Sequence, residues 1–219
     1  MFDDVFWRVG VKAVDTGNGG CYILGMYCRK NHYEQAFESW LEDNHVNYVY
    51  IDQHKRQSFS SERVKTFDYL IYPEKPDGPE QLCGPIVIAE LKGKIFKSES
   101  LAGFRNMECW VSLEDVRGML KWRQVMGAST AAGIAKAVFV FAYKLECIDV
   151  ENDGCEIYDF DGQKYVFYCV DLSDYTDNMK LRSRRWQTVN LSAENFRQKA
   201  FCVRHLLAPE TIRPYRICY

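Results

Sequence analysis

Several features that would assign a protein to a common class are missing from this sequence. It contains no run of about 18 apolar residues, the length that crosses a bilayer as a helix, so we expect no membrane partner. Its first ten residues, MFDDVFWRVG, have acids where a secretory signal has a basic region, so we expect a cytoplasmic protein. The net charge of −2 argues against a chain coated with positive charge, although local basic patches remain open.

The cysteines show no metal-binding pattern. There are nine of them, an odd number, and no two are spaced as CxxC. Structural zinc sites usually contain such pairs, so this spacing argues against one. We expect most of the cysteines to be reduced and buried.

The apolar residues are numerous enough for one compact core, since the chain has 219 residues of which 47% are hydrophobic. Their periodicity predicts helices over 31–44 and 110–127, and strands over 46–52, 66–72, 86–96 and 136–143. This order predicts an α/β fold in which a mixed central sheet is flanked by helices.

The rest of the chain extends this core at both ends. We expect residues 1–29 to form an N-terminal extension of residues 30–143, and residues 144–219 to form a C-terminal elaboration packed on that core. The elaboration is predicted to contain a hairpin that turns at Asp161 and Gly162. A final helix is predicted over 192–207.

The strand IVIAELKGKIF, residues 86–96, carries a charged pair in an apolar row. Alternation places Glu90 and Lys92 on the same face as Ile88. Asp68 interrupts an apolar face of the preceding strand, TFDYLIY, in the same way. If the two strands pair as a hairpin, one register brings Asp68 close to Glu90, with Lys92 one pleat further along.

Two neighbouring carboxylates suit Mg²⁺ or Mn²⁺, which prefer oxygen ligands. Such an ion can activate water and stabilise the displacement at a phosphodiester, and Lys92 could orient or deprotonate that water or offset phosphate charge. These are the parts of a nuclease. An E-x-K sequence taken alone, however, more often marks a solvated strand end.

A third acid, Glu34, lies at the edge of the apolar stripe of the helix over 31–44 and can reach towards the sheet. Glu38 and Glu42 of the same helix are expected to face solvent. A solvated acidic face is the alternative interpretation for Glu34.

Together these residues resemble the PD-(D/E)XK phosphodiesterase superfamily, which has a restriction-endonuclease-like fold. The nearest pattern is similar to the archaeal Holliday-junction resolvases, and the likeness covers residues 30–143. It depends on Glu34 in HYEQAFESWL, on Asp68 in FDYLI, and on Glu90 and Lys92 in IVIAELKGK. The resemblance implies a magnesium-dependent endonuclease that cuts DNA in repair, recombination or defence, and it suggests a homodimer.

The resemblance also implies a role for each residue. Asp68 and Glu90 would ligate Mg²⁺ or Mn²⁺ together with the carbonyl of Leu91. Glu34 would add a ligand through water, and Lys92 would be the general base or contact the phosphate.

Other positions are less typical of the superfamily. Gln124, on the helix that follows the E-x-K, would be an accessory residue, with simple solvation as its alternative. Phe67 stands where many members have a proline before the aspartate. The acidic net charge also differs from that of junction-binding proteins, which are usually basic.

Two basic clusters could contact nucleic acid. The first precedes the Asp68 strand, and the second contains a tryptophan suited to base stacking. Their candidate contacts are Lys55, Arg56, Arg63 and Lys65 in the first cluster, and Arg184 and Arg185, beside Trp186, in the second. Solvated surface is the alternative for both.

The sequence therefore predicts a divalent-metal-dependent nuclease that hydrolyses DNA. The first alternative is a non-catalytic protein of the same fold that binds nucleic acid or a protein partner. The second is an α+β interaction protein whose charged strand ends are only solvated.

Overall fold

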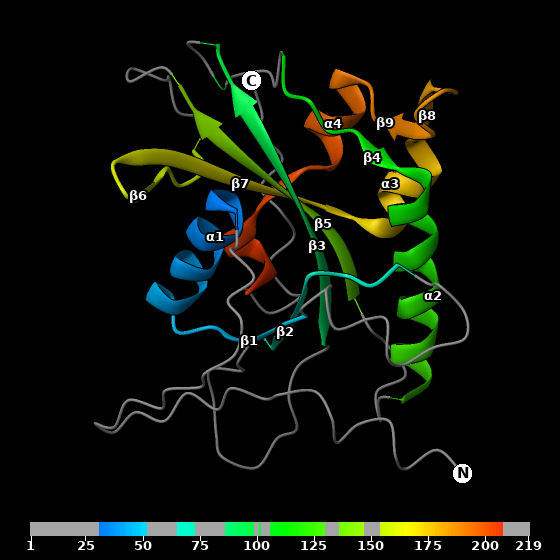
Figure 1. The fold of residues 1–219 in the computed structure, drawn as a ribbon, viewed down its shortest axis with the longest axis horizontal. Helices are drawn as coiled ribbons and strands as arrows, with labels where there is room; N and C mark the ends of the chain where they lie inside the picture. The colour runs from blue at the N-terminus through cyan, green and yellow to red at the C-terminus, as the bar shows by residue number, and fades with distance from the viewer. Residues whose placement is uncertain are drawn as a thin grey trace.

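One mixed β-sheet with helices on both faces forms the fold (Figure 1). The computed structural model describes residues 31–51, 65–72, 86–98, 101, 106–129, 136–146 and 154–207. The strand order is β1-β2-β3-β5-β7-β10, with β6 paired to β7. These strands are β1 (Asn47–Tyr50), β2 (Tyr69–Tyr72), β3 (Val87–Phe96), β5 (Lys136–Leu145), β6 (Tyr158–Phe160), β7 (Gln163–Asp171) and β10 (Phe201–Cys202).

The strand directions follow from the connections. β1, β2 and β3 pair antiparallel, as predicted for a hairpin, and β5 pairs antiparallel with β7. β3 and β5 are parallel over ten residue pairs, which requires a crossover, and the crossover contains α2 (Leu113–Ser129). The predicted α/β class with a mixed central sheet is confirmed.

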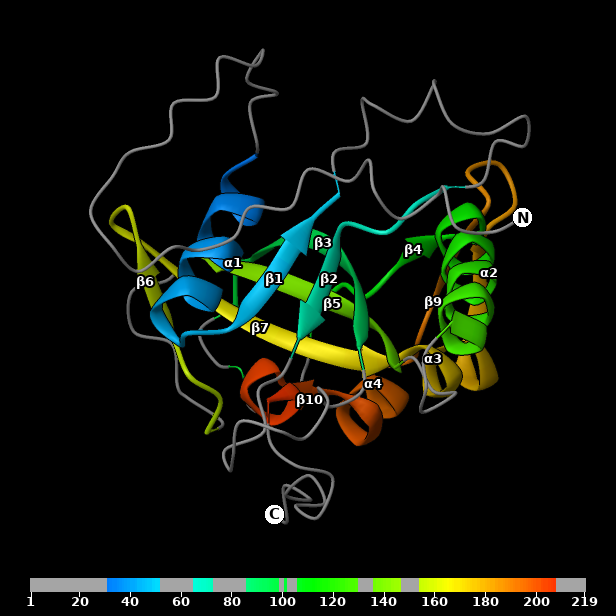
Figure 2. The same cartoon turned by 90° about the horizontal axis from the view of Figure 1, so that it is seen from below.

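Helices lie against both faces of the sheet (Figure 2), and each face has its own apolar core. α1 (His32–Asp43) covers one face, while α2, α3 (Leu172–Asn178) and α4 (Ala193–Lys199) cover the other. Alternation along β3 therefore directs Ala89 and Leu91 towards α1, and Ile88 towards α2. Across the described ranges, no helix has both the length and the apolar character needed to cross a membrane.

The predicted first helix is confirmed, and a capping box fixes its start. The Asn31 side chain accepts hydrogen bonds from the Tyr33 and Glu34 N–H groups, and Glu34 Oε2 accepts from the Asn31 N–H at 3.0 Å. The expectation that Glu38 faces only solvent is wrong. Glu38 is half-buried and accepts a hydrogen bond of 3.2 Å from the Tyr69 hydroxyl, because its helix face lies against β2.

The C-terminal segment confirms one prediction and corrects another. Asp161 and Gly162 join β6 to β7 with positive φ angles of 50° and 69°, as a type I′ hairpin turn requires. The single helix predicted over 192–207 is wrong. α4 ends at Lys199, because Phe201 and Cys202 then pair with the edge of β7 before a 3₁₀ turn (Val203–Leu206) begins.

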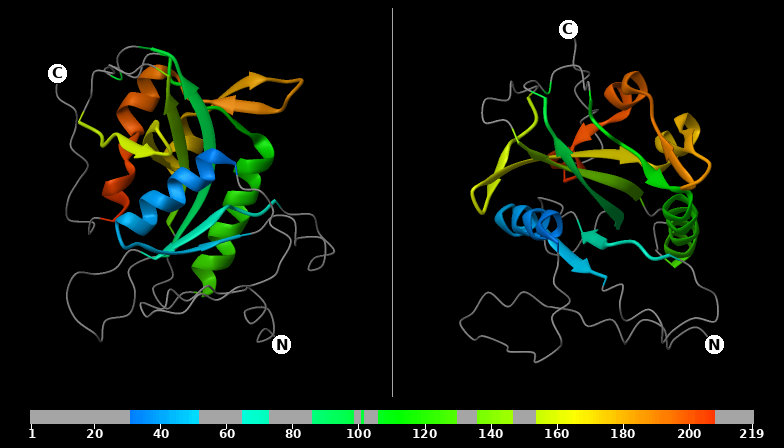
Figure 3. Two further views of the ribbon diagram at one scale, coloured as in Figure 1. Left: turned by 60° about the vertical axis from the view of Figure 1, so that its left-hand side comes forward. Right: turned by 45° about the horizontal axis from the view of Figure 1, so that its top comes forward.

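A three-stranded sheet lies beside the main one, in the order β4-β9-β8. Its strands are β4 (Val111–Ser112), β8 (Lys180–Ser183) and β9 (Thr188–Asn190). β4 leads directly into α2, so this small sheet lies at the N-terminal end of that helix. β8 and β9 form a hairpin that projects from the body of the molecule (Figure 3).

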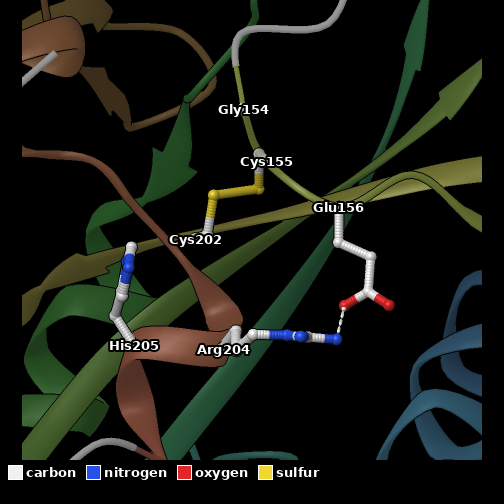
Figure 4. Close-up of a pocket in the computed structure, with 6 residues that line it drawn as sticks. All are labelled: Gly154, Cys155, Glu156, Cys202, Arg204 and His205. Atoms are coloured by element: carbon white, nitrogen blue, oxygen red, sulfur yellow. Dashed lines mark hydrogen bonds and ion pairs between the residues drawn. A yellow bond between two sulfur atoms is a disulfide. The ribbon is translucent and has the colours of Figure 1, made fainter. Parts of the chain in front are cut away.

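Two of the four described cysteines form a disulfide, which corrects the expectation of reduced thiols for that pair. Cys155 precedes β6 and Cys202 lies in β10, 47 residues further along the chain (Figure 4). Local spacing gave no signal for this pair, because the pairing of β10 with β7 brings the two together. Cys109 and Cys169 are free and buried, as expected.

Candidate active site

Two buried acids lie where β2 and β3 meet. The register ends with Tyr69 opposite Ala89, so Asp68 directly precedes β2 and lies beside β3. The Asp68 N–H donates to the Ala89 carbonyl at 3.1 Å, and Asp68 Oδ2 accepts from the Leu91 N–H at 2.8 Å. Only 6% of Asp68 and 2% of Glu90 is exposed. Asp68 therefore lies close to Glu90, because it bonds to the residues on either side of Glu90 in β3.

The Leu91 carbonyl belongs to the same edge of β3. In an extended strand, the N–H and C=O of one residue point towards the same neighbour. Because the Leu91 N–H points at Asp68, its carbonyl oxygen also faces that side. β2 begins only at Tyr69, so within the described ranges no strand pairs with this side of β3 beyond Ala89.

Glu90 also belongs to a closed ring of two carboxylates and two ammonium groups. Lys92 Nζ lies 2.8 Å from Glu90 Oε1 and 3.0 Å from Asp115 Oδ2. Lys65 Nζ lies 3.3 Å from the same Glu90 oxygen and pairs with Asp115 Oδ1. Both lysine side chains are 19% exposed, so the ring is closed to solvent at its acids and partly open at its cations.

Asp115 is positioned by the start of α2. Its N–H donates to Ser112 Oγ at 3.0 Å, and its Oδ2 accepts from the Ser112 N–H at 2.8 Å. These two reciprocal bonds form a capping box. Because α2 begins above β3, the carboxylate that caps the helix also faces Glu90 and Lys92.

Lys65 is positioned by contacts of its backbone with α2. The Trp122 Nε1–H donates to the Lys65 carbonyl at 3.1 Å, and the Trp122 ring packs edge-on against Phe67. Gly118 makes the approach possible, because a Cβ there would lie 2.6 Å from the Lys65 carbonyl oxygen. The helix and the segment before β2 are therefore packed backbone to backbone.

Replacing Gly118 with alanine is expected to destabilise the protein by about 1–3 kcal/mol, as overpacking a tight contact does. Helix propensity alone would favour alanine by about 1 kcal/mol. The steric clash outweighs that gain, because the Lys65 carbonyl cannot move without losing its bond to Trp122. Urea unfolding measures the net effect, and a variant more stable than the wild type would show that the approach is not tight.

The site has two features expected of a cation site, a net negative charge and a buried carboxylate oxygen that accepts no hydrogen bond in the described chain. Three carboxylates, Asp68, Glu90 and Asp115, face two ammonium groups, which leaves one net negative charge. In the described chain, Glu90 Oε2 is buried and accepts no hydrogen bond, a costly state that a cation would relieve. Burial lowers the pKa of Lys65, and the charge of Lys92 lowers it further, while Glu90 opposes both.

A metal ion held here would need ligands beyond the side chains. Nowhere in the described ranges do three or more His, Cys, Asp or Glu side chains form a group that could hold a metal. Asp68 and Glu90 supply two carboxylates, and the Leu91 carbonyl faces the same edge. Mg²⁺ is commonly bound by one or two carboxylates and completes its coordination with water, so this donor set fits it.

The other predicted residues are less close to this centre. Glu34 lies on α1, which covers the opposite face of the sheet, and one of its oxygens caps its own helix. Gln124 is exposed and is not brought to the site, so its accessory role stays a prediction. It follows Asp115 by nine residues, which at about 100° per residue places it half a turn away from the site.

The predicted nucleic-acid contacts fall into three groups. Lys55, Arg56 and Arg63 lie outside the described residues. Lys65, which was a candidate contact for nucleic acid, instead points inward and pairs with Glu90 and Asp115. Arg184 and Arg185 are exposed in the turn between β8 and β9.

A pocket elsewhere on the molecule contains none of the predicted site residues. It surrounds the disulfide and is lined by Gly154, Cys155, Glu156, Cys202, Arg204 and His205 (Figure 4). Its charged residues neutralise each other, since Arg204 donates to Glu156 at 2.8 Å. The candidate chemistry therefore lies at the edge of β3 and not in this pocket.

Sequence reasoning missed Asp115 and misplaced Lys65. Asp115 had a sufficient local explanation as a helix-capping residue, and the helical pattern did not show that only 4% of it is exposed. A usable signal was present at Lys65, which lies three residues before Asp68 and therefore could not extend far from the site.

No protein-family model matches the chain, and neither a curated protein nor a solved structure matches it.

Proposed function

We propose that this chain is a divalent-metal-dependent nuclease that hydrolyses phosphodiester bonds of DNA. The observation that carries the proposal is that Asp68 bonds to both neighbours of Glu90 in β3, beside a buried Glu90 oxygen that accepts no hydrogen bond in the described chain. Two acids placed in this way repel each other unless a cation lies near them. The neighbouring ammonium group of Lys92 suits an anionic substrate.

The residues that would hold the metal are Asp68, Glu90 and the Leu91 carbonyl, with Glu34 as an additional ligand through water. Tyr69 experiences the charges of both Glu34 and Asp68, which raise the pKa of its hydroxyl after the larger effect of burial. Bound Mg²⁺ or Mn²⁺ supplies Lewis acidity and lowers the pKa of water. The chain orients its ligands rigidly, because Asp68 is fixed by the Leu91 N–H.

Lys92 and its partners would act on the substrate directly. The Lys92 ammonium group is partly exposed and can donate a hydrogen bond to a non-bridging phosphate oxygen, which offsets the charge that develops in the transition state. Glu90 and Asp115 hold its Nζ in place from two sides. Asp115 and Lys65 are positioning residues in this proposal, since they act through Lys92 and Glu90.

The order of the described elements supports a restriction-endonuclease-like core. α1, β2, β3, α2 and β5 follow one another as the resemblance requires, with Asp68 directly before β2 and Glu90 in β3. The parallel pairing of β3 with β5 across α2 agrees with a mixed α/β sheet. The DNA substrate and a homodimer are carried only by the resemblance.

A cleavage assay tests the proposal. The purified chain is incubated with Mg²⁺ or Mn²⁺ and with linear, single-stranded and branched DNA and RNA, beside the Asp68→Ala, Glu90→Ala double variant. We expect cleavage of at least one DNA substrate by the wild type, and none in EDTA or with the double variant. Equal cleavage by both proteins, or no cleavage of any substrate, would refute the enzymatic function.

A non-catalytic role in nucleic-acid binding is the second candidate. It is favoured by the closed ring, in which Lys65 and Lys92 already neutralise one oxygen of Glu90. A binding protein would retain DNA affinity in EDTA and cleave nothing. The same assay, followed by a gel-shift measurement, separates the two functions.

A further inference from the structure

Lys94 is a buried cation with an unusual environment. It follows Lys92 by two residues, so both side chains leave the same face of β3. Only 6% of Lys94 is exposed. Among the described residues it forms no hydrogen bond or ion pair, and its Nζ lies 3.3 Å from the centroid of the Trp110 ring.

Trp110 and Glu108 bring a second cation to the same place. The Arg182 guanidinium lies 5.1 Å from the Trp110 centroid, and its Nη2 is 3.3 Å from Glu108 Oε1. The Trp110 Nε1–H donates to Glu108 Oε2 at 3.1 Å, which fixes the indole. Two cations therefore share one aromatic ring, and one carboxylate faces them.

The energetics of this cluster favour an added anion. A buried cation normally has a carboxylate partner, whereas Lys94 has an aromatic ring. The pKa of Lys94 is lowered to about 8, chiefly by burial, with Lys92 and Arg182 acting in the same direction and Glu108 opposing them. An anion within reach of both Lys94 and Arg182 would stabilise both charges and replace lost hydration.

The geometry relates this cluster to the candidate active site. Two residues of an extended strand span about 6.6 Å, a distance comparable to that between successive phosphates of a nucleic-acid strand. Lys92 contacts Glu90, and Lys94 lies one such step further along β3. Arg182 belongs to β8, whose hairpin ends in Arg185 and the 69% exposed Trp186 (Figure 3).

We infer that Lys94 and Arg182, held over Trp110, form a second phosphate subsite that binds the phosphate next to the one that is cut. The substrate strand runs from Lys92 past this subsite towards the β8–β9 hairpin. This inference rests on the proposed nuclease function for the position of the cut, whereas the subsite itself is a binding property that can be measured without cleavage.

Oligonucleotide binding in EDTA tests the subsite. The probe is a fluorescent single-stranded DNA of about 12 nucleotides, and the full chain is titrated at several salt concentrations. We expect Lys94→Met and Arg182→Met each to weaken binding about tenfold and to reduce the salt slope by about 0.7. Lys97→Met removes the same charge from an exposed position near the end of β3 and is expected to change affinity less than about twofold.

A pH series adds a second readout. Lys94 loses its proton as the pH rises through about 8, so the affinity of the wild type should fall between about pH 7 and pH 9, and that of Lys94→Met should fall less. The other groups facing Lys94 are Glu108, Lys92, Arg182 and the buried Cys109, and the pKa of Cys109 is raised to about 11 by burial. The two proteins differ only at Lys94, so their difference reports that group.

Each outcome decides the matter. Wild-type affinity and salt slope in both variants would overturn the subsite, even if the chain cleaves DNA. Weakened binding in a chain that never cleaves would support the subsite and refute the nuclease. Displacement of the probe by a free nucleotide as readily as by an unlabelled strand would overturn the strand path. Arg182 is exposed, so its variant tests binding even if Lys94→Met unfolds.

Discussion

Replacing Asp68 with asparagine is expected to lower the rate of DNA hydrolysis by about three orders of magnitude. Asparagine keeps an oxygen that can accept the Leu91 N–H, so the local backbone is preserved. It removes one of the two buried carboxylate charges that lie where β2 and β3 meet. A thousandfold loss corresponds to about 4 kcal/mol of transition-state stabilisation, which is in the range that a bound metal supplies.

The measurement is single-turnover cleavage at saturating Mg²⁺, with the unfolding of each protein recorded alongside. Asp159→Asn is the matched control, because it makes the same chemical change in the exposed hairpin of β6 and should keep the wild-type rate. Mg²⁺ should raise the Tm of the wild type and of the control, but raise that of Asp68→Asn much less. An Asp68→Asn protein that cleaves at the wild-type rate would remove Asp68 from the proposed mechanism.

The part of the site that could be predicted from the sequence is the part encoded by strand alternation. Period-two patterning placed Glu90 and Lys92 on one face, and the hairpin connection left few registers for Asp68. The Asp161–Gly162 turn was equally readable, because few residues tolerate positive φ. These features depend on local chemistry that the sequence displays directly.

The rest depends on contacts between distant elements. Lys65 looked like part of a solvated basic loop, and it turns inward because Trp122 holds its carbonyl and Gly118 lets α2 approach. The alternation in residues 86–96 makes Lys94 look like one more charged residue at a solvated strand end, yet the Trp110 ring covers it. The residue spacing in the sequence does not predict either tryptophan contact, because each contact joins segments that only the fold brings together.

The closed ring of two carboxylates and two ammonium groups contributes both to stability and to the candidate chemistry. A substitution of Asp115 measures its contribution to stability. Asp115→Asn is expected to lower the free energy of unfolding by about 3 kcal/mol. Removing one partner from buried ion pairs costs about 3–5 kcal/mol, and the partial exposure of Lys65 and Lys92 places this case at the lower end. Asparagine retains an oxygen for the Ser112 N–H, so the loss reports the ion pairs and not the helix cap.

A double-mutant cycle isolates the interaction. Lys65→Met removes the opposite charge, and the double variant Lys65→Met, Asp115→Asn should lose about 1–3 kcal/mol less than the sum of the single losses. Asp174→Asn is the matched control, because its pair with Lys199 is exposed and should contribute less than about 1 kcal/mol. A coupling energy near zero would mean that the lysine and the aspartate do not hold each other. The role of Lys65 as a positioning residue, which acts through Asp115 on Lys92, would then lose its structural support.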